Sequence, residues 1–346
     1  MTFDFNPNAV GRPNGNYFAL PYSLEESEIV LLSVPWDATA SYGIGASLAP
    51  EAIIDASEQV DLFDADVADA WTIKIGTEPI DKSLHKLNKH ARHCSDIVIA
   101  ALQSGIEDIS LQKEVSFVNA ASMQVNDYVY SKAKKYLSEN KLVGVVGGEH
   151  SVPFGLIKAL NEQYPSFGIL HIDAHADLRQ AYEGFTYSHA SIMYNALKEL
   201  EHVEQLVSVA VRDYCDDEAQ LIATQPRVKA FTDSYLAGAM FNGQSWATLC
   251  DEMIAALPQK VYISFDIDGL SPENCPHTGT PVPGGLRYNQ ALFLLNKLMM
   301  SGKQIIGFDL CEVAVGDDEW DANVGARLLY KLCCYAYSTN FFKQTI

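Results

Sequence analysis

Basic residues are scarce in this sequence, which has 24 Lys and Arg against 44 Asp and Glu and a formal net charge of −20. Nucleic-acid binding depends on clustered Lys and Arg that contact phosphates. The composition therefore excludes nucleic acid as a partner. The same negative field attracts cations, so metal ions and a small cationic substrate fit the charge balance, although an acidic surface also serves solubility alone.

Long apolar runs are missing as well. No stretch of about 18 apolar residues occurs, as a membrane-spanning helix requires, and the N-terminal residues lack the basic start and apolar core of a signal peptide. We therefore expect a cytoplasmic protein with no membrane partner. The seven cysteines show no C-x-x-C spacing that would indicate zinc or redox chemistry, so we expect reduced, mostly buried thiols.

Short apolar segments rich in β-branched residues alternate with longer amphipathic segments along the 346 residues. This alternation is typical of a parallel sheet with crossover helices. The predicted strands are 28–34, 71–76, 142–146, 167–172, 205–211, 228–231, 260–267 and 304–310. The predicted helices are 86–103, 127–139, 152–163, 191–199 and 289–300, and the poorly periodic segment 104–126 is interpreted as an insertion.

Nothing in the sequence divides the chain, because it contains neither an internal repeat nor a Pro/Gly/Ser-rich linker. We therefore expect one α/β domain over residues 1–346, built on a doubly wound, mainly parallel sheet. In such sheets ligands bind beyond the carboxyl ends of the strands. Residues that follow predicted strands are therefore the first candidates for chemistry.

Three predicted strands are followed by side chains of the kinds that bind metals. They are His150 after 142–146, Asp173, His175 and Asp177 after 167–172, and Asp266 and Asp268 at the end of 260–267. Residues two apart in an extended segment face the same way, so the alternating ligands of a motif point to one side. Each motif taken alone also fits a capped loop.

Together these motifs bring four carboxylates and two imidazoles to the same end of three strands. Burying that many like charges is prohibitive unless cations neutralise them. Two divalent ions would balance the four carboxylates, and a mixed oxygen and nitrogen ligand set suits manganese better than a thiolate-binding metal. The sequence therefore predicts a site for two metal ions.

Four motifs carry a resemblance to a known family. GGEHS (147–151), DAHAD (173–177), SFDIDGLSPENCPHTGTPVPGG (264–285) and GFDLCEV (307–313) resemble the ureohydrolases, which include arginases, agmatinases, formimidoylglutamases and guanidinobutyrases. The similarity runs from about Ile29 to Leu332. The resemblance implies a three-layer α/β/α fold, the arginase-like fold, with a dinuclear Mn²⁺ site.

The resemblance also implies the ligands of each ion. One ion is held by His150, Asp173, Asp177 and Asp266, and the other by His175, Asp173, Asp266 and Asp268, so that Asp173 and Asp266 bridge. Two cations that share bridging carboxylates lower the pKa of a water molecule between them, which makes hydroxide available at neutral pH. The expected reaction is attack of that hydroxide on a guanidino carbon, followed by release of urea and an amine.

Three catalytic roles follow from the same resemblance. Asp177 relays a proton to the leaving nitrogen, His189 shuttles protons, and Glu312 clamps the substrate guanidinium. Without the resemblance, Glu312 fits a capping or surface carboxylate, and His189 fits a histidine at a helix N-terminus. His171 alternates with Asp173 and is interpreted as a histidine that supports the site or the core.

The loop after DAHAD indicates the substrate. Residues 178–189, LRQAYEGFTYSH, resemble the agmatinase branch more than the Asn/Ser-containing loop of arginases. Agmatine is therefore the predicted substrate, with putrescine and urea as products. Arginine, formimidoylglutamate, guanidinobutyrate and guanidine stay open as alternatives.

Two further hypotheses are disfavoured. A zinc hydrolase of the deacetylase type keeps a single-metal Asp/His/Asp set, whereas this chain offers six ligands. A non-catalytic, metal-stabilised subunit is disfavoured because every ligand position holds a competent side chain. The resemblance also implies a homo-oligomer, either a trimer or a hexamer.

Overall fold

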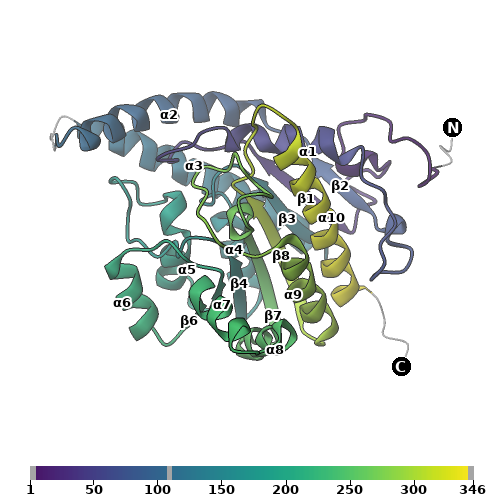
Figure 1. Ribbon diagram of the computed structural model, residues 1–346. Coiled ribbons are helices and arrows are strands. Elements are labelled where there is room, and N and C mark those ends of the chain that lie inside the picture. The colour runs from purple at the N-terminus through teal and green to yellow at the C-terminus, as the bar shows by residue number, and fades with distance from the viewer. Residues whose placement is uncertain (1–4, 107–110, 342–346) are drawn as a thin grey trace.

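The computed structural model describes residues 5–106 and 111–341. Eight strands form one parallel sheet, which helices cover on both faces (Figure 1). The strands are β1 (Ile29–Val34), β2 (Ile75–Glu78), β3 (Leu142–Gly147), β4 (Phe167–Ile172), β5 (Val203–Val209), β6 (Val228–Phe231), β7 (Lys260–Asp266) and β8 (Gln304–Cys311). The predicted α/β class with a three-layer α/β/α arrangement is confirmed.

The strands lie in the order β2-β1-β3-β8-β7-β4-β5-β6, and every neighbouring pair is parallel. Because parallel strands end at one edge, the residues after β3, β8, β7 and β4 lie side by side in the middle of the sheet. β3 and β4 are buried at every residue, as expected for strands with helices on both faces. The sheet order therefore gathers the predicted motifs before any loop contributes.

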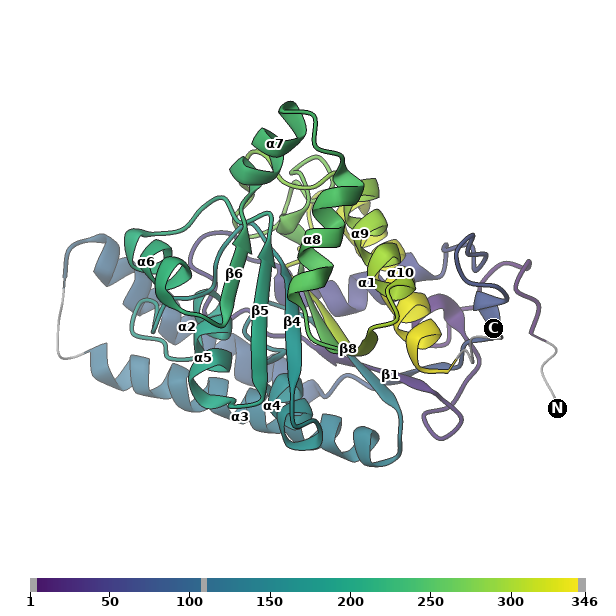
Figure 2. The same cartoon turned by 90° about the horizontal axis from the view of Figure 1, so that it is seen from below.

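Ten α-helices occur in the described part of the chain. They are α1 (Ala49–Ser57), α2 (Lys82–Gln103), α3 (Gln112–Ser138), α4 (Phe154–Gln163), α5 (Ile192–Glu199), α6 (Asp216–Thr224), α7 (Asp233–Phe241), α8 (Trp246–Ala256), α9 (Tyr288–Met300) and α10 (Trp320–Asn340). One face of the sheet packs on α2, α3, α4 and α5, and the other packs on α1, α8, α9 and α10 (Figures 1 and 2). A cluster of buried apolar side chains fills each interface.

Residues 112–126 of the segment interpreted as an insertion form the N-terminal half of α3, where the sequence pattern predicted no helix. Residues 107–110 lie outside the described part of the chain. Val118, Ala121 and Val125 are buried along one side of α3, at the spacing of a helix face. This stripe is narrow, and the polar residues between its members dilute the period in the sequence.

Two predicted strands have boundaries that differ from the observed ones by more than one residue. β2 begins at Ile75, and Ala70–Thr72, which precedes it, forms a 3₁₀ helix. β5 ends at Val209, because Ala210 takes a positive φ of 74°. Helices α1, α6, α7, α8 and α10 are additional to the predicted ones.

The described strands all belong to one sheet, and the extent of a single domain over 1–346 stays a prediction. Six of the seven cysteines are buried, as expected, and Cys215 is partly exposed. Within residues 5–106 and 111–341, no helix has both the length and the apolar composition that crossing a membrane requires.

Candidate metal centre

The six predicted metal ligands follow β3, β4 and β7, all of which lie in the centre of the sheet. Asp173 comes directly after β4, and Asp266 is the last residue of β7. His150 follows a tight turn at the end of β3. A Cβ at Gly148 would collide with the carbonyl oxygen of Trp36, so only glycine fits in this turn. The six side chains therefore meet because of strand order and one close backbone approach.

The inner half of the cluster is defined here by His150 and Asp177, both of which are buried. His150 Nδ1 lies 3.1 Å from Asp177 Oδ2 and 2.9 Å from Asp173 Oδ2. Asp266 Oδ2 is 3.3 Å from the same nitrogen. Three carboxylate oxygens thus converge on one point in front of the imidazole.

Hydrogen bonds behind His150 determine which ring nitrogen faces this point. His150 Nε2 lies 2.9 Å from Ser264 Oγ, and Ser264 donates its hydroxyl hydrogen to Asp309 Oδ2 at 2.8 Å. Ser264 must therefore accept from His150 Nε2–H, which leaves the lone pair of the neutral ring on Nδ1. Tyr262 donates to Asp309 at 2.6 Å and the Phe265 amide does so at 3.2 Å, so the supporting carboxylate is itself fixed.

The outer half is defined by His175 and Asp268. His175 Nδ1 lies 3.1 Å from Asp268 Oδ2 and 3.5 Å from Asp173 Oδ1. The Asp268 amide donates to Asp266 Oδ1 at 2.9 Å. Asp173 and Asp266 therefore each turn one oxygen toward the inner half and the other toward the outer half, as bridging carboxylates do.

The electrostatics of the cluster favour added positive charge. Burial and the charge of Asp173 raise the pKa of Asp177 to about 6, and burial with neighbouring carboxylates raises the pKa of Asp266 well above its usual value. Burial disfavours the charged form of His175, but the surrounding carboxylates outweigh it and raise the pKa of His175 to about 12. Burial also opposes ionisation of Asp173, yet the adjacent histidines hold its pKa well below the usual range. The cluster thus takes up positive charge, either as protons or as cations.

The donor atoms fit divalent cations. A single hydrogen on His150 Nδ1 cannot satisfy three carboxylate oxygens, and Asp177 Oδ2 is buried without a hydrogen-bond donor among the described residues. A cation in front of Nδ1 would satisfy all four atoms. The close donor groups are His150, His171, Asp173 and Asp177 on one side and Asp173, His175 and Asp268 on the other, so that Asp173 belongs to both. Oxygen and imidazole donors without thiolate suit an ion such as Mn²⁺.

His171 supports this cluster from inside the sheet. Its Nε2 lies 2.9 Å from Asp173 Oδ2, and its Nδ1 lies 3.3 Å from Ser208 Oγ. Although His171 is close enough to join the inner donors, both of its nitrogens already have partners. This geometry is consistent with the interpretation of His171 as a supporting histidine.

Asp177 is held in a strained backbone conformation. It has a positive φ of 54°, which a non-glycine residue rarely adopts. Its carbonyl accepts hydrogen bonds from the amides of Met193 at 3.1 Å and Tyr194 at 3.0 Å, in the first turn of α5. The helix therefore fixes the turn that aims the Asp177 carboxylate at His150.

Glu312, which follows β8, lies against the inner half. Its Oε1 accepts from the backbone amide of His150 at 2.8 Å, and its own amide donates to the Gly148 carbonyl at 2.9 Å. Its φ is also positive, at 61°. Burial and the charge of Glu149 raise the pKa of Glu312 well above its usual value. A buried carboxylate of this kind is a favourable place for a cationic group.

Two loops at the edge of the cluster contact each other beside Glu312. Thr278 donates its hydroxyl to the Glu312 carbonyl at 2.9 Å. The next residue, Gly279, accepts a hydrogen bond from the Gly43 amide at 3.0 Å. A Cβ at Gly43 would lie 2.6 Å from the Gly279 carbonyl oxygen, so this approach requires glycine. The loop after β1 and the loop after β7 therefore touch backbone to backbone.

His189 stands at the start of the short 3₁₀ helix His189–Ser191. Its amide donates to Thr39 Oγ1 at 3.1 Å, and its Nδ1 lies 3.4 Å from the same oxygen. Burial and the nearby His175 lower the pKa of His189 to about 4, so its ring is neutral at neutral pH. A neutral imidazole offers one donor and one acceptor, as a proton shuttle needs.

Three residues that shape the site are absent from the predicted set, namely Asp309, Thr39 and Arg212. Arg212 Nη2 donates to the backbone carbonyls of Asp268 at 2.7 Å, Leu270 at 3.2 Å and Val282 at 3.0 Å, which fixes the loop after β7. The only sequence signal was at Asp309, because an acidic residue inside an apolar strand is rarely buried without a purpose. Neither Arg212 nor Thr39 belongs to one of the motifs from which the site was predicted.

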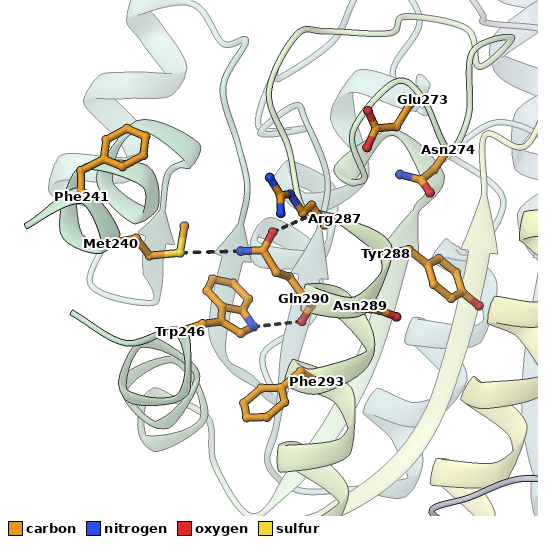
Figure 3. A pocket seen from close by; sticks show the side chains of 10 residues that line it. All are labelled: Met240, Phe241, Trp246, Glu273, Asn274, Arg287, Tyr288, Asn289, Gln290 and Phe293. Carbon is orange, nitrogen blue, oxygen red and sulfur yellow. Dashed lines mark hydrogen bonds between the residues drawn. The ribbon is translucent and has the colours of Figure 1, made fainter. Parts of the chain in front are cut away.

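A surface pocket of about 740 Å³ is separate from this cluster (Figure 3). It is lined by side chains of α7, α8 and α9 and of the loop before α9, including Met240, Trp246 and Phe293. None of the eight predicted site residues lines it. The chemistry predicted from the sequence therefore does not belong to this pocket.

Comparison with characterised proteins gives relatives along most of the chain. The chain is 30% identical to N(1)-aminopropylagmatine ureohydrolase of Thermus thermophilus over 310 residues, which is 90% of each protein. It is 28% identical to agmatinase of Bacillus anthracis over 300 residues, which is 86% of this chain and 88% of the relative.

Solved structures with the same fold include two hydrolases. The agmatine ureohydrolase of Thermoplasma volcanium superposes with a TM-score of 0.72 at 22% identity, over 97% of this chain and 98% of that one. The proclavaminate amidino hydrolase of Streptomyces clavuligerus gives 0.71 at 20% identity, over 96% and 100%.

The fold, the strand-end cluster and these relatives define the class of the protein, a ureohydrolase that acts on linear amidines, of the agmatinase-like branch. The chain belongs to the arginase family, whose model matches residues 27–334.

Proposed function

We propose that this protein is a dinuclear manganese hydrolase that converts agmatine to putrescine and urea. The observation that supports it most is the convergence of three carboxylate oxygens on His150 Nδ1, next to a second donor group that shares Asp173. Carboxylates and imidazole arranged in this way hold two ions about 3.5–4 Å apart in hydrolases. Their function would be to make hydroxide available at neutral pH.

In this proposal His150 and Asp177 would hold one ion and His175 and Asp268 would hold the other. Asp173 and Asp266 would contribute to both, because each turns its two oxygens to the two halves. The Ser264–Asp309 pair supports the assignment, since it leaves the lone pair of His150 on the nitrogen that faces the carboxylates.

Glu312 binds the guanidinium of the substrate. One of its oxygens is held by the His150 amide, which leaves the other to accept from a guanidinium N–H. The contact also neutralises a carboxylate whose burial disfavours its charge. Because Glu312 follows β8, between β3 and β7, it orients the guanidino carbon over the cluster.

Proton transfer is assigned to Asp177 and His189. Asp177 lies beside His150 at the centre of the cluster, so it can pass a proton to the leaving nitrogen. His189 has a neutral ring and exchanges protons with the departing amine. Hydrolysis is complete when that nitrogen leaves as an amine and urea is released.

The choice of agmatine rests on the loop 178–189 and on the names of the relatives. The curated relatives described above are named for guanidino compounds with an amine tail, N(1)-aminopropylagmatine and agmatine. A net charge of −20 also favours a substrate that is cationic at both ends.

The experiment that tests this proposal is reconstitution with Mn²⁺, followed by assays of urea or formamide release. The substrates are agmatine, N(1)-aminopropylagmatine, arginine, guanidinobutyrate, formimidoylglutamate and guanidine. Agmatine should give the highest kcat/KM, with two manganese ions per chain by elemental analysis. If another compound of the panel were hydrolysed and agmatine were not, that compound would replace agmatine as the proposed substrate. Absence of turnover on the whole panel with two metals bound would contradict the proposed activity.

Assembly and location extend the proposal. We expect a trimer or hexamer, which size-exclusion chromatography with light scattering would show. A cytoplasmic location also stays a prediction, which fractionation of the source cells would test.

A further inference from the structure

A buried hydrogen-bond chain connects Glu149 to His189 through Thr39. Thr39 donates its amide to Glu149 Oε2 and its hydroxyl to Glu149 Oε1, both at 2.7 Å. Glu149 also accepts from Ser151 Oγ at 2.6 Å. Glu149 and Thr39 are fully buried, so these bonds face no competition from solvent. The predicted ligands and catalytic residues include neither of them.

The direction of this chain is determined by its donors. With Glu149 ionised, all three neighbouring groups donate to its carboxylate, which acts only as an acceptor. Thr39 has a single hydroxyl hydrogen, which it uses toward Glu149. Toward His189, Thr39 Oγ1 therefore presents only lone pairs, and it already accepts the His189 amide at 3.1 Å. The contact from His189 Nδ1 to the same oxygen is favourable only if Nδ1 carries the hydrogen.

We propose that Thr39, anchored by Glu149, holds His189 in the tautomer with its hydrogen on Nδ1, so that Nε2 is the nitrogen that takes up and returns a proton. Thr39 is thus a positioning residue for the reaction, and this inference rests on the proposed function of His189. No described residue hydrogen-bonds His189 Nε2, which leaves that nitrogen available to substrate. One proton taken up at Nε2 and given back to the amine returns the ring to its neutral form.

Ser188 is the competing partner of His189. Its Oγ also lies 3.4 Å from His189 Nδ1, and it accepts from the Ala190 amide at 3.2 Å. Unlike the hydroxyl of Thr39, that of Ser188 is not engaged by a carboxylate and has room to rotate. Ser188 therefore adapts to either tautomer, and Ser188→Ala is the matched control for loss of a hydroxyl at the same distance.

The test is a double-mutant cycle on the manganese-loaded enzyme. Thr39→Val should lower kcat by about 10- to 100-fold, the usual effect of removing a group that orients a catalytic histidine, with little change in KM. Thr39→Ser should restore kcat, and Ser188→Ala should stay close to wild type. In a His189→Ala background, Thr39→Val should have no further effect. Equal losses in both backgrounds, or unchanged kcat in Thr39→Val, would overturn the proposal. Metal content and thermal unfolding check that each variant is folded.

The tautomer is also measured without turnover. In ¹⁵N-histidine-labelled protein loaded with diamagnetic Mg²⁺, the two-bond ¹⁵N–¹H pattern of His189 should show the hydrogen on Nδ1, and in Thr39→Val it should show a mixture. Hydrogen on Nε2 in the wild type would overturn the inference whatever the enzyme hydrolyses. Failure of the substrate panel with the Nδ1–H form present would instead contradict the proposed function alone.

Discussion

The inner and outer halves of the metal cluster use the same kinds of ligands in different surroundings. The side chain of His150 is 1% exposed, and Ser264 and Asp309 fix its second nitrogen. The side chain of His175 is 25% exposed, and no described residue is hydrogen-bonded to its Nε2. The inner half is therefore fixed in advance, whereas the outer half is partly exposed to solvent. We therefore expect the inner half to bind its metal ion more tightly than the outer half does.

The largest effect should come from removing a carboxylate that the two halves share. Asp173→Asn takes one charge from both donor groups. Urea release should fall by about 1,000-fold or more, which corresponds to roughly 4 kcal/mol of lost charge stabilisation in the transition state. Elemental analysis should also show less than the full manganese content. Asp55→Asn, on the exposed side of α1, is the matched control and should leave both measurements unchanged. Full metal content in Asp173→Asn would show that the halves do not share this ligand.

Replacing one histidine at a time separates the halves directly. In chelator-treated protein at pH 7, His150→Asn leaves buried carboxylates without their protonated partner and should lower the free energy of unfolding by about 3 kcal/mol. His175→Asn, at the partly exposed position, should lower it by about 1 kcal/mol or less. Urea denaturation gives both values. Equal losses would mean that burial does not distinguish the two histidines.

Changing the hydrogen bonds behind His150 should have a smaller effect, confined to the inner half of the cluster. Asp309→Asn weakens the acceptor that keeps Ser264 turned toward it, so the lone pair of His150 is no longer fixed on Nδ1. Affinity for the tighter of two manganese ions should fall about 10- to 100-fold in calorimetric titration. Tyr262→Phe removes only one donor to Asp309 and should cause a lesser loss. If only the affinity for the more weakly bound ion changed, the inner half would be the site of that ion instead.

The smallest effect is expected from the backbone around the outer half. Arg212→Lys keeps the charge but removes the fork that binds the carbonyls of Asp268, Leu270 and Val282. The weaker manganese ion should lose affinity by about fivefold, roughly 1 kcal/mol, because one hydrogen bond or two are lost. The tighter ion should be unaffected. Loss of both ions in the same titration would show that this loop supports the whole cluster.

The sequence was most informative where chemistry follows buried parallel strands. β3, β4 and β7 place His150, Asp173 and Asp266 at one edge, and this position follows from the strand pattern alone. The first half of α3 was missed because only a narrow stripe of it is buried. Thr39 was missed for a different reason, since its role depends on a contact with Glu149, more than 100 residues away in the chain. Pairings of that kind depend on loop packing, which no local pattern encodes.

The backbone contact between Gly43 and Gly279 has a consequence for engineering this enzyme. The close approach of the two loops leaves no room for a side chain at Gly43. A loop that replaces either of them must therefore fit the shape of the other. Attempts to graft another specificity should therefore transplant both segments as one cassette. Libraries that vary only one of the two loops should yield mostly variants in which these loops are misfolded. Exchange of both loops together should leave the rest of the fold intact.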